Sequence, residues 1–280
     1  MRLAHAKVNL WLKIVGRRAD GYHLLESLVA FADLADAVEA VPSDGLSLQI
    51  GGPQSAALSA ESDNLVLKAA RLLAGRAGLS PRAALHLTKN IPVAAGLGGG
   101  SADAAAALAE LVELWRIALP AEELFDLASA LGADVPMCLA GRPALASGVG
   151  ERLAPTPPLP ACAILLVNPG VALPTAEVFA ARQGGFSAPA VTMRRWVDLD
   201  DFARMLAAHG NDLEAPAIAL RPIVADVLAA LRTSAGVRYA AMSGSGATCF
   251  ALYDDVARAH VAASGLPAAW WRHAGVLASG

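Results

Sequence analysis

The sequence contains little cysteine, few aromatic side chains and little charge. Its three cysteines are widely separated among 280 residues, and they provide neither a zinc-ligand spacing nor a disulfide framework. The net charge is −3, which does not indicate a basic nucleic-acid-binding surface. Because 55% of the residues are hydrophobic, a folded chain is expected rather than a disordered one. We therefore predict a cytoplasmic protein without a nucleic-acid partner.

Long hydrophobic runs are also missing. Lys7 and Lys13 interrupt the first apolar stretch, so we expect no secretion signal there. The longest uncharged run lies between Arg152 and Glu177, and its six prolines are incompatible with a membrane helix. We expect no membrane partner.

The most informative stretch is rich in glycine. It consists of Pro92, Val93, Ala94, Ala95, Gly96, Leu97, Gly98, Gly99, Gly100, Ser101 and Ala102. Consecutive glycines allow φ > 0 and let several backbone N–H groups face one side of a turn. The alanine-rich sequence that follows favours a helix, with Ser101 as its N-cap and Asp103 in its first turn. A glycine loop that leads into a helix N-terminus is typical of a phosphate site.

Two common phosphate loops do not fit this stretch. It has no Gly-Lys-Ser/Thr, and it lacks both the last glycine and the distal acidic residue of the dinucleotide-binding fingerprint. A plain glycine hinge before an alanine helix remains an alternative.

Alternating hydrophobic residues over 6–15 predict a half-buried strand that carries Lys7 and Asn9 on one face. Asp20-Gly21 predicts a hairpin turn, after which Tyr22 and His23 begin the return strand. Further strands are expected over 38–50 with a break at 42–45, and over 84–87, 161–167 and 249–253. Helices are expected over 65–77, 120–131, 176–182, 197–208 and 222–233. Ser62-Asp63-Asn64 is expected to cap the first of these, and Gly132 to end the second. The proline-rich segment 152–160 is the best boundary between domains 1–153 and 161–280.

Two other loops contain candidate site residues. Pro136 is expected to keep Val135 out of the helical region, which places Asp134 on a tight connection where an aspartate often only caps the backbone. The small residues of 243–248 are compatible with a hairpin turn, or with the close approach of another backbone or a ligand.

Three separated stretches, 6–10, 92–102 and 242–248, resemble the three motifs of the GHMP small-molecule kinases, in the same order. The resemblance is closer to one family, the 4-diphosphocytidyl-2-C-methyl-D-erythritol kinases, in residues 16–23, 97–103, 132–136 and 168–175. His5 stands where that family commonly has proline.

The resemblance implies an α+β, two-domain GHMP kinase fold, with an N-terminal domain like ribosomal protein S5 domain 2 and a ferredoxin-like C-terminal domain. It implies ATP-dependent phosphorylation of the 2-hydroxyl of 4-diphosphocytidyl-2-C-methyl-D-erythritol, giving ADP, in the non-mevalonate isoprenoid pathway. The cofactors are then ATP and Mg²⁺. The partner is a small-molecule substrate, cytidine diphosphate methylerythritol, and the protein is expected to be a monomer or a weak homodimer.

The resemblance also implies roles for individual residues. Asp134 matches the catalytic base and Lys7 its cationic partner, which would stabilise the charge that develops during phosphoryl transfer. Residues 92–102 match the ATP phosphate loop, with the Ser101 hydroxyl as a Mg²⁺ contact. The remaining matches are Asn64 and Lys89 near the nucleotide, and Asn9, Tyr22, His23 and Thr175 in the substrate cleft.

Each role has a simpler alternative, in which Lys7 is a solvated strand-edge charge and Tyr22 a packing residue. Two other functions are considered: a GHMP kinase of the homoserine or mevalonate type, and a nucleotide-binding module without catalysis. The sequence Ala-Asp-Gly-Tyr-His, which ends at His23, argues against the first. The presence of both Lys7 and Asp134 argues against the second.

Overall fold

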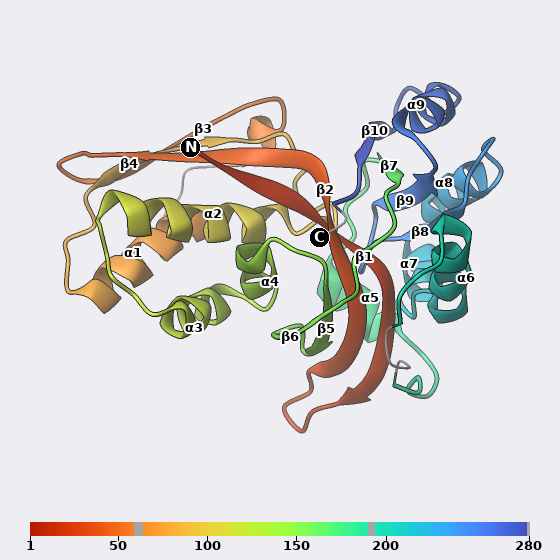
Figure 1. Cartoon of the computed structure of the whole chain (residues 1–280), viewed down its shortest axis with the longest axis horizontal. Helices are drawn as coiled ribbons and strands as arrows, with labels where there is room; N and C mark the ends of the chain where they lie inside the picture. Colours follow the sequence, from red (N-terminus) through yellow and green to blue (C-terminus); the bar gives the residue numbers. More distant parts are fainter. Residues whose placement is uncertain (59–63, 190–193, 279–280) are drawn as a thin grey trace. The chain divides into compact units, whose positions relative to one another are not determined.

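The structure, a computed structural model, describes residues 1–58, 64–189 and 194–278 (Figure 1). The chain forms two compact units that alternate along the sequence. Unit 1 consists of Met1–Lys7, Leu34–Val93 and Gly98–Gly141, and unit 2 of Val8–Asp33, Ala94–Leu97 and Arg142–Gly280. The domain boundary expected in the proline-rich segment 152–160 stays a prediction. Residues 152–155 of this segment form a strand.

Two long strands pass from one unit into the other along the chain. Strand β1 (Arg2–Arg17) pairs with β2 (His23–Val41), which confirms the predicted hairpin. The alternating pattern predicted one buried face for β1, but Lys7, Asn9 and Trp11 are buried as well as the apolar residues between them. The half-buried assignment was therefore wrong, because both faces of this strand are covered.

In the part of unit 1 that the structure describes, there are a sheet, four α-helices and a short 3-10 helix. The strands are β3 (Leu46–Gly51), β4 (Ala83–Thr88) and the second half of β2; β3 is parallel to β4, and β2 is antiparallel to it. The helices are η1 (Ser55–Ala57), α1 (Leu65–Ala77), α2 (Gly99–Leu114), α3 (Ala121–Leu131) and α4 (Val135–Ala140).

Helix α2 lies at the centre of the unit 1 core. Its residues 102–108 are all buried, and six of these seven are alanine or leucine. The small side chains let α2 pack closely against α1, which runs beside it in Figure 1. The alanine run therefore supplies packing as well as helix propensity.

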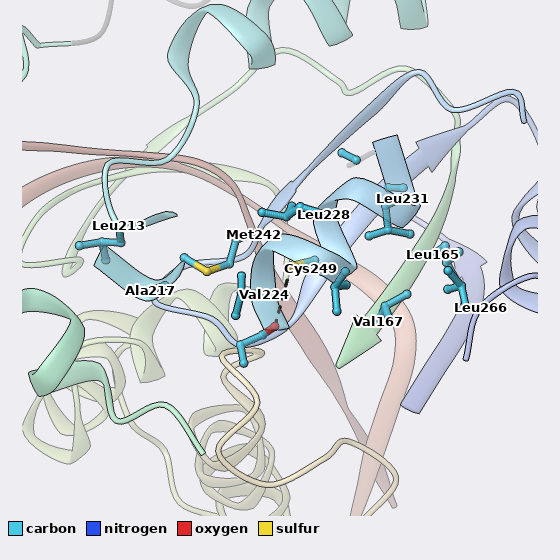
Figure 2. Close-up of a cluster of buried hydrophobic side chains, with 14 of the residues drawn as sticks. Leu165, Val167, Leu213, Ala217, Val224, Leu228, Leu231, Met242, Cys249 and Leu266 are labelled. Carbon is cyan, nitrogen blue, oxygen red and sulfur yellow. Dashed lines mark hydrogen bonds between the residues drawn. The ribbon is translucent and has the colours of Figure 1, made fainter. Parts of the chain in front are cut away.

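Unit 2 contains the first half of β2 with β5 (Ala144–Gly148) and β6 (Arg152–Pro155), and a second, antiparallel sheet in the order β10-β7-β9-β8. The strands of this second sheet are β7 (Ala163–Asn168), β8 (Tyr239–Met242), β9 (Cys249–Tyr253) and β10 (Trp271–Val276). Its helices are α5 (Thr175–Ala181), α6 (Leu199–His209), α7 (Glu214–Leu220), α8 (Ile223–Arg232) and α9 (Val256–Ser264). Figure 2 shows the hydrophobic core of this unit, where side chains of α7 and α8 meet those of β7, β8 and β9.

The predicted helices and strands are all present. The elements that were not predicted are η1, α4, α7, α9, β5, β6, β8 and β10. Two local predictions were wrong. Helix α2 begins at Gly99 with Gly98 as its N-cap, so Ser101 is not the cap and Asp103 lies beyond the first turn. Val135 is helical, because Pro136 stands in the first turn of α4, where its missing N–H costs no hydrogen bond.

Within the residues that the structure describes, no helix combines the length and the hydrophobicity needed to cross a membrane.

Replacing Leu228 tests the unit 2 core. This side chain is 1% exposed on α8, so Leu228→Ala should lower the free energy of unfolding by about 2–5 kcal/mol, through lost burial and a residual cavity. Val261 on α9 is 68% exposed, so Val261→Ala should change it by less than about 0.5 kcal/mol. Urea unfolding of both variants measures the difference, and equal losses would contradict the core assignment.

Candidate active site

Lys7 and Asp134 form an ion pair in unit 1. The distance from Lys7 Nζ to Asp134 Oδ2 is 3.1 Å, and the side chains are 7% and 39% exposed, respectively. Lys7 is therefore not the solvated strand-edge charge that was considered. Asp134 is the N-cap residue of α4, yet its side chain makes no capping hydrogen bond. Its carboxylate is thus directed to the lysine while it stays accessible to solvent.

The glycine loop meets Lys7 at the start of α2. Gly98 has φ of 65°, a left-handed conformation that favours glycine. A Cβ atom at this position would lie 3.1 Å from Lys7 Cε and 3.2 Å from Lys7 Cβ. Glycine is therefore required both by the backbone conformation and by the contact with Lys7.

The first turn of α2 supplies backbone donors next to this pair. Helical hydrogen bonding begins with Ala102 N–H donating to Gly98 O at 2.9 Å. The N–H groups of the residues just before Ala102 therefore have no partner within the helix, and the helix dipole places partial positive charge there. Gly98, Gly99 and Ser101 are each partly exposed. This geometry suits an anion.

Lys89, expected near the nucleotide, is the centre of a buried charge cluster. Its ammonium bonds to Asp36 and, at 2.7 Å, to Asp103 Oδ2. Asp36 Oδ1 in turn accepts hydrogen bonds from the backbone N–H groups of Asn90 and Ile91. All three charged side chains are 4% exposed or less. This arrangement favours a role in holding the chain that enters the glycine loop.

The two carboxylates of this cluster outnumber its one ammonium group. Burial raises the pKa of Asp103 to about 7; the nearby charge of Asp36 adds to the shift, and the Lys89 ammonium opposes it. A Cβ on Gly99 would lie 3.2 Å from Lys89 Nζ, so the cluster lies directly against the start of α2.

Asn64 also has a structural contact. It is the N-cap of α1, and its Oδ1 accepts a hydrogen bond from Val66 N–H at 2.9 Å. Its expected place near the nucleotide stays a prediction. The neighbouring residues Ser62 and Asp63, expected to cap the same helix, lie outside the described residues.

In unit 2, the small-residue loop 243–248 lies against residues 94–97 of the glycine-rich stretch. A Cβ on Gly96 would collide with the carbonyl oxygen of Gly246, and Thr248 N–H donates to Ala95 O at 3.3 Å. Ala94 has φ of 54°, a strained value for a residue with a side chain. The close backbone approach considered for loop 243–248 is thus confirmed.

Asn9 is linked to the same loop. Its backbone N–H donates to Ser243 Oγ at 3.1 Å, and its amide nitrogen donates to Ser27 Oγ at 2.7 Å. A Cβ on Gly244 would lie 2.9 Å from Asn9 Oδ1. The sequence did not indicate Ser27. Its hydroxyl accepts from the Asn9 amide and donates to Trp11 O, and so it helps to hold the Asn9 side chain in place.

The other residues expected in the substrate cleft lie near the hairpin and near α5. Tyr22 is 65% exposed, which argues against a packing role. The His23 ring lies 5.2 Å from that of Phe179, and Thr175 Oγ1 lies 2.8 Å from Ser245 Oγ. Phe179 was missed, although its position one helical turn after Thr175 was available as a signal.

Two family descriptions and several known proteins match this chain. Residues 64–142 match the GHMP kinases N terminal domain, and residues 193–271 match the GHMP kinases C terminal family. A 4-diphosphocytidyl-2-C-methyl-D-erythritol kinase of Paramagnetospirillum magneticum is 52% identical over 271 residues, covering 96% of this chain and 95% of that protein. One of Ruegeria pomeroyi is 54% identical over 253 residues, with coverage of 90% and 88%.

A solved 4-(cytidine 5'-diphospho)-2C-methyl-D-erythritol kinase has a TM-score of 0.83 at 40% identity and covers 100% of this chain and 99% of its own. The chain belongs to the family of 4-diphosphocytidyl-2-C-methyl-D-erythritol kinases. The expected two-domain GHMP kinase fold is confirmed. A homoserine kinase of Cytophaga hutchinsonii shares this fold with a TM-score of 0.72 at 17% identity, covering 99% of this kinase and 94% of its own chain.

Replacing Lys89 in this kinase tests whether the residue stabilises the fold or contacts the nucleotide directly. Lys89→Met leaves two buried carboxylates without their cation, so the free energy of unfolding should fall by roughly 3–5 kcal/mol. Arg142 is exposed, and Arg142→Met should change it by less than about 0.5 kcal/mol. Denaturant unfolding checks both. A Lys89→Met variant of unchanged stability with weak ATP binding would instead support direct contact with the nucleotide.

His23 offers a test of the charge around the hairpin. Burial lowers the pKa of its imidazole below the ordinary value, and the positive charges of Arg17 and Arg182 lower it further. The ring should therefore be neutral at pH 7. Arg17→Gln should raise the pKa of His23, while Arg204→Gln should leave it unchanged. NMR titration of the imidazole Cε1–H signals measures both shifts, and a fall in the pKa of His23 in Arg17→Gln would contradict the charge assignment.

Proposed function

We propose that this kinase transfers the γ-phosphoryl group of ATP to the 2-hydroxyl of 4-diphosphocytidyl-2-C-methyl-D-erythritol, which gives the 2-phosphate and ADP. The family supports the substrate, and the reaction belongs to the non-mevalonate route to isoprenoid precursors. The observation that carries the chemistry is the Lys7–Asp134 pair beside Gly98 at the start of α2.

In this proposal Asp134 is the base. As the substrate oxygen forms its bond to the γ-phosphorus, the bond from that phosphorus to the ADP oxygen breaks, and the hydroxyl proton passes to the Asp134 carboxylate. Its 39% exposure leaves the carboxylate within reach of a substrate. Lys7 balances the negative charge on the carboxylate and on the transferred group.

The phosphates of ATP are held mainly by backbone groups. The N–H groups at the start of α2 and the positive end of its dipole favour the triphosphate, and Gly98 gives it access without a side chain. Asn64 and Lys89 complete the proposed nucleotide region, Lys89 through the chain that it anchors.

Mg²⁺ fits this site as an ion that arrives with the nucleotide. Among the described residues no cluster of three or more His, Cys, Asp or Glu side chains is arranged to hold a metal. Mg²⁺ commonly keeps its waters and binds through substrate phosphates with few protein ligands. Ser101, in the first turn of α2, is the residue proposed to contact it, and the ion would neutralise phosphate charge.

The acceptor substrate is assigned to residues of unit 2. The exposed Tyr22 ring and the His23 imidazole suit a pyrimidine, by stacking and by hydrogen bonding to its polar edge. Asn9 and Thr175 are proposed to bind the remaining polar groups. The protein is proposed to act in the cytoplasm on this small molecule, as a monomer or weak homodimer that binds neither nucleic acid nor a membrane.

A homoserine or mevalonate-type acceptor is the second candidate, because the homoserine kinase has the same fold. That likeness, at 17% identity, concerns the fold alone. ADP release measured with each of the three acceptors decides between them, and turnover only with homoserine or mevalonate would overturn the proposed substrate.

Asp134→Asn should keep ATP binding and lower kcat by roughly 100- to 10,000-fold, because an amide cannot accept the hydroxyl proton. Asp126 on α3 provides a matched control, since it is exposed and undergoes the same chemical change in Asp126→Asn. Coupled ADP assays and titration with an ATP analogue measure the two effects. Near-normal turnover of Asp134→Asn would remove this residue from the mechanism.

A further inference from the structure

Asn211, between α6 and α7, forms hydrogen bonds to the backbone with both the nitrogen and the oxygen of its side-chain amide. Its amide nitrogen donates to Met242 O at 2.9 Å and to Gly244 O at 2.8 Å, and its Oδ1 accepts from Leu213 N–H at 2.9 Å. Two carbonyl oxygens on one side and an N–H on the other admit only one orientation of the amide. The residue therefore connects the start of α7 to the loop 243–248.

The backbone around Asn211 is itself fixed to β1. Leu12 N–H donates to Gly210 O at 3.0 Å, and Asp212 N–H donates to Leu12 O at 2.9 Å. The Asp212 carboxylate adds bonds to Ile14 N–H and to Lys13 Nζ, at 2.8 and 3.1 Å. Asn211 thus extends from a firmly held segment, and its side chain can act as a fixed support.

The loop that Asn211 supports contacts residues proposed to bind the acceptor. Ser243 accepts the hydrogen bond of Asn9 N–H, and Gly244 lies so close to Asn9 Oδ1 that a Cβ would be 2.9 Å from it. Ser245 bonds to the Thr175 hydroxyl at 2.8 Å. A shift of the loop would therefore move the surroundings of two proposed substrate contacts.

We propose that Asn211 is a positioning residue for the acceptor substrate, which it serves by holding loop 243–248 through the carbonyl oxygens of Met242 and Gly244. The assignment of Asn9 and Thr175 to substrate binding rests on the proposed function. Asn211 touches no reacting group; it acts through Asn9 and Thr175.

A purely structural role makes a different prediction. Asn211 Oδ1 also accepts from Leu213 N–H in a local Asx turn just before α7, whose N-cap is Leu213, and an aspartate can form the same turn. Asn211→Asp keeps this acceptor and the side-chain shape, but it removes both donors and places a carboxylate against two carbonyl oxygens. Asn211→Ala removes the donors and the acceptor without adding charge. The two variants therefore separate holding of the loop from the local turn at Leu213 N–H.

If Asn211 positions the loop, Asn211→Asp should be the more damaging variant. Its KM for the cytidyl substrate should rise about tenfold or more, while kcat changes less, because Lys7 and Asp134 belong to unit 1. Asn211→Ala should show a smaller rise in KM. The control is Asp255→Ala, which removes the cap of α9 at Arg258 N–H and should leave KM unchanged.

Hydrogen exchange of the ligand-free protein gives a second measurement, which does not depend on the substrate. Gly246 N–H donates to Ser243 O at 3.0 Å within the loop, and its protection should fall in Asn211→Asp and Asn211→Ala but not in Asp255→Ala. Should Asn211→Asp fail to fold by circular dichroism, Asn211→Ala alone is compared with Asp255→Ala.

The outcomes separate the two proposals. Wild-type KM and loop protection in a folded Asn211→Asp, with a defect only in Asn211→Ala, would show a role limited to the local turn and overturn the positioning role. If wild-type protein fails to phosphorylate the cytidyl substrate, the proposed function is wrong, and loop exchange still decides whether Asn211 holds the loop.

Discussion

The ion pair between Lys7 and Asp134 is the contact on which the proposed chemistry depends. A lysine buried in β1 requires compensation for its charge, and Asp134 provides it with a carboxylate that solvent still reaches. The same lysine stem packs against Gly98, where no side chain has room. One residue therefore contacts both the proposed base and the start of α2, where the backbone donors lie.

Lys89 shows what the same type of interaction does when it is fully enclosed. Its partners Asp36 and Asp103 are both almost completely buried, while Asp134 is 39% exposed. An enclosed carboxylate has no access to a substrate, so it can hold the chain but cannot take a proton from a ligand. The difference in exposure, and not the presence of a lysine–aspartate pair, distinguishes the framework cluster from the proposed catalytic pair.

Local sequence patterns predicted the helices and strands they encode, but not the features that arise from distant contacts. Asn64 as the cap of α1 and the end of α3 before Gly132 follow from neighbouring residues, and both were predicted correctly. Ser101 is a better intrinsic cap than Gly98, yet α2 begins three residues earlier than a Ser101 cap would place it, with its N-cap glycine packed against Lys7. Likewise, the pairing of Lys89 with Asp36 joins residues 53 apart, which no local pattern reveals. The motifs indicated where the proposed site lies. The burial of each side chain, which the motifs do not show, distinguishes the enclosed Lys89 cluster from the accessible Asp134.

The small-residue loop 243–248 extends this argument. Glycine at 244 and 246 allows left-handed backbone conformations and close contacts. Glycine also allows many other conformations, so these residues do not by themselves determine the conformation of the loop. The selection comes from outside the loop, from the amide of Asn211 on one side and from Asn168 Nδ2 bonded to Thr248 Oγ1 on the other. Neither asparagine lies in the glycine-rich motif, and each also bonds a backbone N–H near its own position. The conformation of this loop of small residues thus depends on side-chain amides from segments distant in the sequence. Those segments support the loop as much as its own glycines do.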